Sequence, residues 1–138
     1  MPPVGAASRQ PLRAGAAILL AAMVLAACGT DEAGERDFDP GPTPPEFAVG
    51  RKDYGEKCRR CHGEHGLGTS LGPPLVHEYY APAHHADAAF LRAVMLGVQQ
   101  HHWTFGPMPA MPELGEARTR LITGYVRWLQ RKAGIYTQ

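Results

Sequence analysis

The segment Cys58-Arg59-Arg60-Cys61-His62 constrains this chain of 138 residues more than any other feature. Its two thiols are three residues apart, as on one helical turn, and an imidazole follows directly. A structural zinc site would need a second ligand pair at similar spacing, and no second cysteine pair exists. A thioredoxin-type redox site would need a βαβ context, which the sequence does not indicate. The spacing instead predicts covalent haem attachment, with both thiols in thioether bonds and His62 on the iron.

The N-terminal segment indicates export. Arg9 and Arg13 precede an apolar run over residues 14–27, which is shorter than the about 20 residues of a membrane-spanning helix. This combination is typical of a secretory signal peptide. The run ends in LAACG at residues 25–29, which resembles the lipobox of bacterial lipoproteins. That resemblance implies a lipid on Cys28, whereas a plain signal peptide or an uncleaved anchor is the alternative.

Composition divides the chain into four parts. We expect a lipoprotein signal peptide over 1–27, an acidic Pro/Gly-rich linker over 28–45, a folded domain over 46–134 and a C-terminal tail over 135–138. The linker contains four prolines, five acidic residues and a single large apolar residue, Phe38, so no core is expected there. The formal net charge of +1 and the lack of a long basic run argue against a nucleic-acid partner.

Three segments of the domain predict helices. The first covers residues 47–57 and leads into the cysteine motif, and the second covers 87–97, with Asp87 as N-cap and Gly97 at its end. The third runs from about 113 to 134 and has a broad apolar face. Basic residues lie mostly opposite that face, which indicates a solvated surface. They are Arg118, Arg120, Arg127, Arg131 and Lys132.

Over residues 46–134 the sequence resembles the class I monohaem cytochromes c. Gly50 and Tyr54, which precede the first motif cysteine by eight and four residues, carry part of this match. The resemblance implies an all-α fold, the small cytochrome c fold, with three to four helices and irregular loops wrapping one haem. It also implies that Gly50 and Tyr54 form a crossing with the last helix. Their expected partners there are Ile122 and Tyr125.

The resemblance also implies which residues surround the haem. Residues 72–75, Gly-Pro-Pro-Leu, are similar to the family's Gly-Pro-x-Leu, whose proline carbonyl accepts the Nδ1 proton of the axial histidine. This role falls to Pro73, and Leu75 is expected to pack on the haem. Such a bond fixes the imidazole and makes its other nitrogen more basic. Trp103 and Phe105 are expected to shield the haem from water.

The second axial ligand is expected from the loop before the last helix. The family signature there is a Met-Pro pair, and such pairs begin at both Met108 and Met111. The register of related sequences favours Met108 as the ligand and leaves Met111 as the alternative. His101 and His102 are near enough in sequence to compete. A thioether ligand would raise the potential of the haem.

The resemblance implies an electron carrier with one covalent haem c that exchanges electrons with redox partner proteins. We expect it to be exported and held by the lipid on Cys28 at the periplasmic or extracellular face of a bacterial membrane. No carboxylate pair, nucleophile motif or phosphate loop indicates enzymatic chemistry or a small-molecule substrate. Two other functions stay open. One is a copper-handling protein that uses its histidine and methionine loops without haem, and the other is a haem-based ligand sensor with a displaceable methionine.

Overall fold

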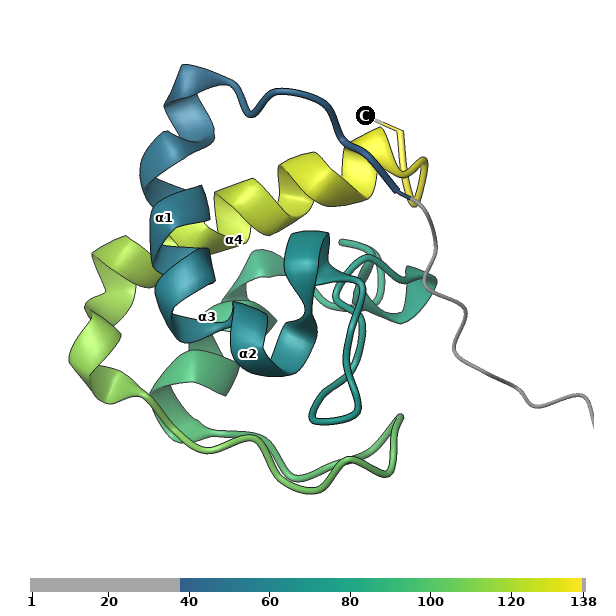
Figure 1. Ribbon diagram of the computed structural model, residues 1–138. Helices are drawn as coiled ribbons and strands as arrows, with labels where there is room; N and C mark the ends of the chain where they lie inside the picture. Colours follow the sequence, from purple (N-terminus) through teal and green to yellow (C-terminus); the bar gives the residue numbers. More distant parts are fainter. Residues whose placement is uncertain (1–37, 138) are drawn as a thin grey trace, which may run out of the picture. The chain divides into compact units, whose positions relative to one another are not determined.

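A computed structural model describes residues 38–137 of the chain, so the predicted signal peptide, Cys28 and much of the predicted linker lie outside it. Within this range the elements are helical, and pairing between strands is limited to two isolated bridges. The predicted all-α class is therefore confirmed (Figure 1). The α-helices are α1 (Ala48–Lys57), α2 (Arg59–His62), α3 (Asp87–Leu96) and α4 (Gly115–Lys132). Short 3-10 helices are η1 (Pro45–Phe47), η2 (Glu64–Gly66), η3 (Glu78–Tyr80) and η4 (Pro112–Leu114).

Helices α1 and α4 cross at Gly50 (Figure 1). A Cβ atom on Gly50 would lie 2.1 Å from the carbonyl oxygen of Leu121, so only glycine permits this approach of the two backbones. One turn later the Tyr54 ring packs edge-on against Tyr125, with the ring centroids 5.5 Å apart. The crossing predicted through Gly50, Tyr54 and Tyr125 is therefore present. Ile122 is buried and lines the pocket described below.

The core lies along α4, whose apolar stripe faces α1, α3 and the loops. Phe47 stacks on Trp128, and Trp128 stacks in turn on Tyr125. Leu121 lies outside the buried stripe of α4: this residue is 44% exposed, and its carbonyl oxygen faces Gly50. The buried apolar residues of α4 are Ile122, Tyr125, Val126, Trp128 and Leu129.

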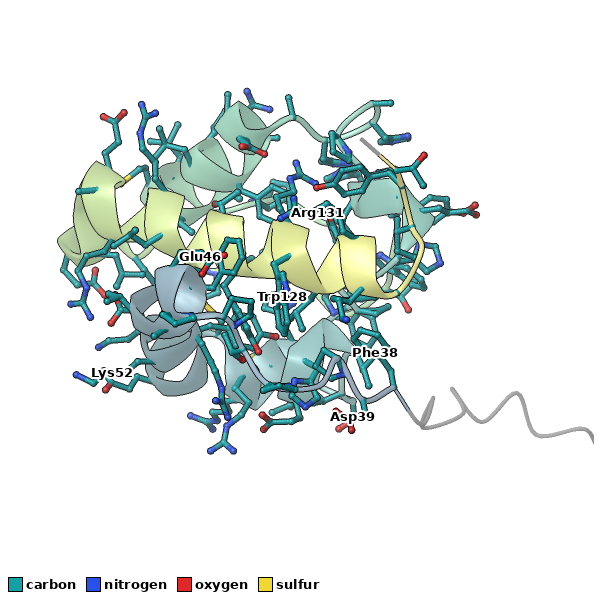
Figure 2. All side chains as sticks on the ribbon, turned by 90° about the horizontal axis from the view of Figure 1, so that it is seen from above. Phe38, Asp39, Glu46, Lys52, Trp128 and Arg131 are labelled. Carbon is teal, nitrogen blue, oxygen red and sulfur yellow. The ribbon has the colours of Figure 1, made fainter. Side chains whose placement is uncertain are left out.

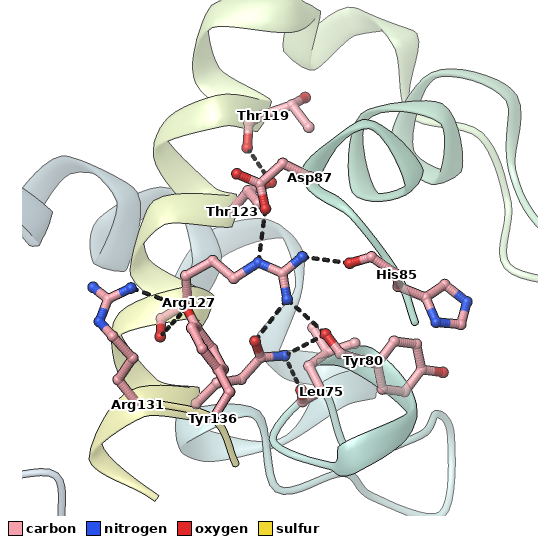
Figure 3. A network of polar contacts seen from close by, with 10 residues as sticks. Leu75, Tyr80, His85, Asp87, Thr119, Thr123, Arg127, Arg131 and Tyr136 are labelled. Carbon is pink, nitrogen blue, oxygen red and sulfur yellow. Dashed lines mark hydrogen bonds and ion pairs between the residues drawn. The ribbon is translucent and has the colours of Figure 1, made fainter. Parts of the chain in front are cut away.

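Arg127 corrects the prediction of a solvated basic face on the last helix. Its side chain is buried and donates hydrogen bonds to Asp87, to Gln130 Oε1 and to the carbonyl oxygens of Tyr80 and His85 (Figure 3). The residue lies between two core positions on a turn of α4 that is buried on most sides, so its charge requires partners there. These bonds join α4 to the start of α3 and to the segment before it.

Both ends of α3 show how the sequence positions this helix. Its N-cap is Ala86, which corrects the prediction of Asp87, because the Asp87 carboxylate accepts from Arg127 instead of capping the helix. Gly97 ends the helix with φ of +75°, as predicted. A Cβ on Gly97 would lie 2.7 Å from the Met108 carbonyl oxygen. The absence of a side chain at Gly97 therefore also lets the segment around Met108 pass close to the end of α3.

The end of the predicted linker differs from the expected extended chain. Phe38 packs against the core and lies edge-on to His65, and Pro40 is buried. The segment runs beside α4, on the side that carries Trp128 (Figures 1 and 2). Packing thus begins before residue 46. Among residues 38–137, no helix has both the length and the apolar character that a membrane span requires.

Candidate haem site

One pocket of about 650 Å³ opens between α2, α3, α4 and the loop that precedes α4. Its volume is within the range of about 300–1,000 Å³ that is common for cofactor sites, and its wall is mainly apolar. The structure brings together on this wall every haem-site residue that the sequence predicts within the described range. They are Cys58, Cys61, His62, Pro73, Leu75, Trp103, Phe105, Met108 and Met111.

The cysteine motif reaches the pocket because the chain leaves α1 and turns directly into α2. The Cys58 amide donates to the Tyr54 carbonyl at 2.8 Å, and the His62 amide donates to the Cys58 carbonyl at 3.0 Å. This single turn places both thiols and the imidazole at one wall. Cys58 is buried, whereas Cys61 is exposed. The motif therefore presents one thiol inside the domain and one at the rim of the pocket.

The Cys58 thiol is unlike that of a disulfide oxidoreductase. Burial raises the pKa of Cys58 to about 11. Redox-active Cys-x-x-Cys sites depend on a thiol whose pKa is depressed, because the thiolate is the nucleophile. The environment of Cys58 thus argues against thiol–disulfide exchange and agrees with a thiol that anchors a group in the pocket.

His62 is oriented by the hydrogen bond predicted for it. Its Nδ1 donates to the carbonyl oxygen of Pro73 at 2.9 Å. Burial lowers the pKa of His62, and the bond to Pro73 only partly opposes that shift. The imidazole is therefore neutral at neutral pH, with Nδ1 occupied and Nε2 free to bind a metal.

The two candidate methionines reach the pocket from a loop that doubles back on itself (Figure 1). The amide and carbonyl groups of Met108 both pair with Val98, at 2.9 and 3.0 Å, in an isolated antiparallel bridge. The Met111 amide donates to the carbonyl of Val94 on α3 at 2.7 Å. Both side chains line the pocket and pack partly buried against the core. The fold thus holds both thioethers at the same cavity as His62.

Trp103 provides a test of whether the pocket fits a haem. Its indole Nε1 is buried and lies near the Tyr80 side chain, but no hydrogen bond of good geometry satisfies it among the residues that the structure describes. A buried N–H without an acceptor is costly, and a haem propionate in the pocket would supply one. Phe105 lies at the rim with its side chain 41% exposed. The thiols, the neutral imidazole, the thioethers and this free donor all suit a covalently bound haem.

A comparison with protein families identifies the family of this chain. The family model for cytochrome c matches residues 47–130, which is more than half of the chain. The chain belongs to the cytochrome c family. This cytochrome binds one covalent c-type haem, and haem-based electron transfer is its function. No curated protein and no solved structure matches the chain in the corresponding searches.

The sequence reasoning missed the α4 wall of the cytochrome's pocket, although its spacing was visible. Thr119, Ile122, Thr123 and Val126 line the cavity at intervals of three and four residues, as one helix face does. Two threonines interrupt the apolar pattern of this helix face, so the sequence alone does not show it as continuous. Their hydroxyls donate to the carbonyls four residues earlier, at 2.8 and 2.9 Å, so each presents its methyl group without an unpaired polar atom.

Proposed function

We propose that this cytochrome is an exported electron carrier in which His62 and Met108 are the axial ligands and Cys58 and Cys61 form the thioethers. The observation that supports this most directly is the meeting of these four side chains at one pocket, although they come from segments about 50 residues apart. The bound haem iron supplies reversible one-electron exchange. The fold keeps the four required side chains at one pocket.

The residues around the pocket have separate tasks under this proposal. The Pro73 carbonyl fixes the His62 ring and favours electron donation from its Nε2. The apolar faces of α3 and α4, together with Leu75, exclude water from the ring, which favours the reduced state. The exposed position of Cys61 leaves one edge of the cofactor near the surface. A redox partner would exchange electrons at that edge.

Met108 is preferred to Met111 because the family register favours it, and the local backbone supports this choice. The two hydrogen bonds to Val98 fix the main chain of Met108 from both sides, and the Gly97 backbone lies directly against it. Met111 is the N-cap residue of η4, where the chain already turns toward α4. We assign Met111 to apolar packing beside the ligand.

Single replacements of the two methionines in the haem-loaded protein test this assignment. The ferric protein should show the weak red absorption band of a methionine–iron bond. Met108→Ala should abolish the band, let the reduced protein bind carbon monoxide and lower the potential, because axial ligands set it over a span of about 0.8 V. Met111→Ala should retain the band. A wild-type protein without the band that binds carbon monoxide readily would favour the ligand-sensor alternative.

The second part of the proposal concerns location. We propose that residues 1–27 are a lipoprotein signal peptide and that a lipid on Cys28 holds the cytochrome at a bacterial membrane, outside the cytoplasm. The support is the charged start, the apolar run and the lipobox-like residues 25–29. Fractionation of cells that express the full chain tests it. The protein should be in the membrane fraction, and mass spectrometry should find a lipid on a chain that begins at Cys28, whereas Cys28→Ser should keep residues 1–27 and carry no lipid. A wild-type chain without a lipid would exclude this part of the proposal.

A further inference from the structure

Three histidines converge at the edge of the haem pocket, and two of them, His85 and His102, are part of its lining. His84 and His85 belong to the segment between η3 and α3, and His102 belongs to the loop that leads to Met108. One ring nitrogen from each lies within 4.8 Å of the others. We propose that His84, His85 and His102 form a second, non-haem site for a divalent transition-metal ion. None of the three is a proposed axial ligand of the haem.

The spacing of the rings suits one shared ion. The ring centroids are 4.9, 5.1 and 5.3 Å apart, which is close to an equilateral triangle. A tetrahedral zinc ion bound at about 2.0–2.1 Å holds its nitrogen ligands about 3.4 Å from one another. The rings of His84 and His85 are stacked, with an angle of 18° between their planes, so at least one of them must turn for the three nitrogens to converge on one ion. Three imidazoles leave the fourth position open, and the exposed His84 places that position toward solvent.

The hydrogen bonds of the cluster leave suitable nitrogens free. The Nδ1 atom of His85 donates to the Tyr79 carbonyl, and metal-binding histidines commonly use one ring nitrogen in this way. His102 Nε2 is buried and has no hydrogen-bond partner within residues 38–137. A metal ion would satisfy that nitrogen. Burial, followed by the neighbouring imidazoles, also lowers the pKa of His102, which keeps the ring in the neutral form that binds metals.

The main chain beneath the site is held firmly. Arg127 donates to the carbonyls of Tyr80 and His85, so the segment that carries His84 and His85 is fastened to α4 (Figure 3). The positive charge of Arg127 opposes a second cation nearby, but the Asp87 carboxylate pairs with Arg127. The backbone that carries His84 and His85 is therefore held in place, and the positive charge of Arg127 is already paired. A bound ion would join this segment to the loop that carries Met108, across the pocket.

The ligand set indicates the class of metal. Neutral imidazoles suit zinc, copper and nickel, whereas magnesium and calcium prefer oxygen ligands. By the general order of affinities, Cu²⁺ should bind more tightly than Zn²⁺. Zn²⁺ is the better probe because it has no redox chemistry and does not react with the haem iron.

Calorimetric titration of the ferric, haem-loaded full chain with Zn²⁺ tests the site. We expect one ion at the cluster, with His84→Gln, His85→Gln and His102→Gln each weakening it by about tenfold or more. His65→Gln is the control, because the His65 ring lies edge-on to Phe38 and has no ring contact with the three histidines. The zinc affinity of this variant should equal that of the wild type. The haem spectrum, recorded for every variant, should be unchanged and reports that the fold is retained.

Two results would overturn the inference. One is a wild-type protein that takes up no Zn²⁺, or variants of the three histidines that bind it as the wild type does. The other is a change of the haem spectrum in His102→Gln with unaltered zinc affinity, which would assign His102 to the haem. Because His84 is exposed, its replacement does not threaten folding and keeps the test valid if a more buried variant is unstable.

Discussion

Asp53 shows how a single buried charge is balanced in this cytochrome. Its side chain is almost fully buried on α1, and both of its oxygens accept from the guanidinium of Arg118, at 2.9 and 2.5 Å. The planar guanidinium binds the carboxylate through two hydrogen bonds, and this bidentate geometry is the strong form of an arginine–carboxylate pair. The pair also fastens α1 to the first turns of α4. Arg118 thus has a structural role that its place among solvated basic residues does not suggest.

The Asp53 pair predicts a pH-dependent contribution to stability. Hydrogen bonding to Arg118 lowers the pKa of Asp53 below its usual 3.8. The pair therefore stabilises the fold above the unfolded pKa, and this contribution is lost as the pH falls through the lower folded pKa. Thermal unfolding should show Asp53→Asn less stable than the wild type at pH 7, with the two converging in acid.

The exposed Lys52–Glu56 pair on the same helix supplies the control for Asp53. Its charged atoms are 3.8 Å apart and mostly solvated, so Glu56→Gln should change stability little at any pH. A stability loss in Asp53→Asn that is the same at pH 7 and in acid would contradict the linkage.

At the scale of elements, the crossing of α1 and α4 sets the position of the haem motif. The crossing fixes the end of α1, and the end of α1 delivers Cys58 to the pocket. The approach depends on the absence of a side chain at Gly50. Tyr54 then closes the gap one turn later, and its hydroxyl donates to the Gly63 carbonyl at 2.9 Å, just past the motif. Helix packing and cofactor attachment are therefore coupled through one helix.

Gly50→Ala should destabilise the cytochrome by about 1–3 kcal/mol, because the new methyl group forces α1 away from the Leu121 carbonyl. At about 4–8 °C per kcal/mol, the loss should be plain in a thermal melt. Gly55→Ala on the same helix is the matched control. A Cβ there meets no atom within 4 Å, so this variant should be neutral or more stable by up to about 1 kcal/mol. Equal destabilisation by both variants would refute the role of the crossing.

Across the whole molecule, local sequence patterns predicted the helices and the haem motif, but they did not predict most long-range contacts. The three main helices follow from short spacings with a physical reason, whereas the Gly50 crossing and the His62–Pro73 bond were predicted from the resemblance to the cytochromes c. The burial of Arg127 does not, because its partner Asp87 is 40 residues away and nothing near either residue indicates the pairing. Phe38 was read as part of a linker for a similar reason. Its contacts with the core and with His65 exist only after the chain has folded back.

The haem should also be a structural part of the domain. Its pocket is bounded by core residues such as Val94, Ile122 and Val126, so an empty site would be a large apolar cavity. A bound haem would remove this apolar surface from water, and that burial would stabilise the folded domain.

The double replacement Cys58→Ala, Cys61→Ala removes the covalent attachment and tests this dependence. The purified chain without haem should lose its cooperative thermal transition and show poorly dispersed amide resonances. A sharp thermal transition at the wild-type temperature would show that the polypeptide folds stably without haem.

The unequal burial of the two motif cysteines gives the haem attachment an inner and an outer bond. Cys58 is buried from solvent but lines the pocket, and burial raises its pKa to about 11. Cys61 is exposed. Under the proposed attachment, the thioether at Cys58 is therefore shielded from the solvent, whereas the thioether at Cys61 borders it.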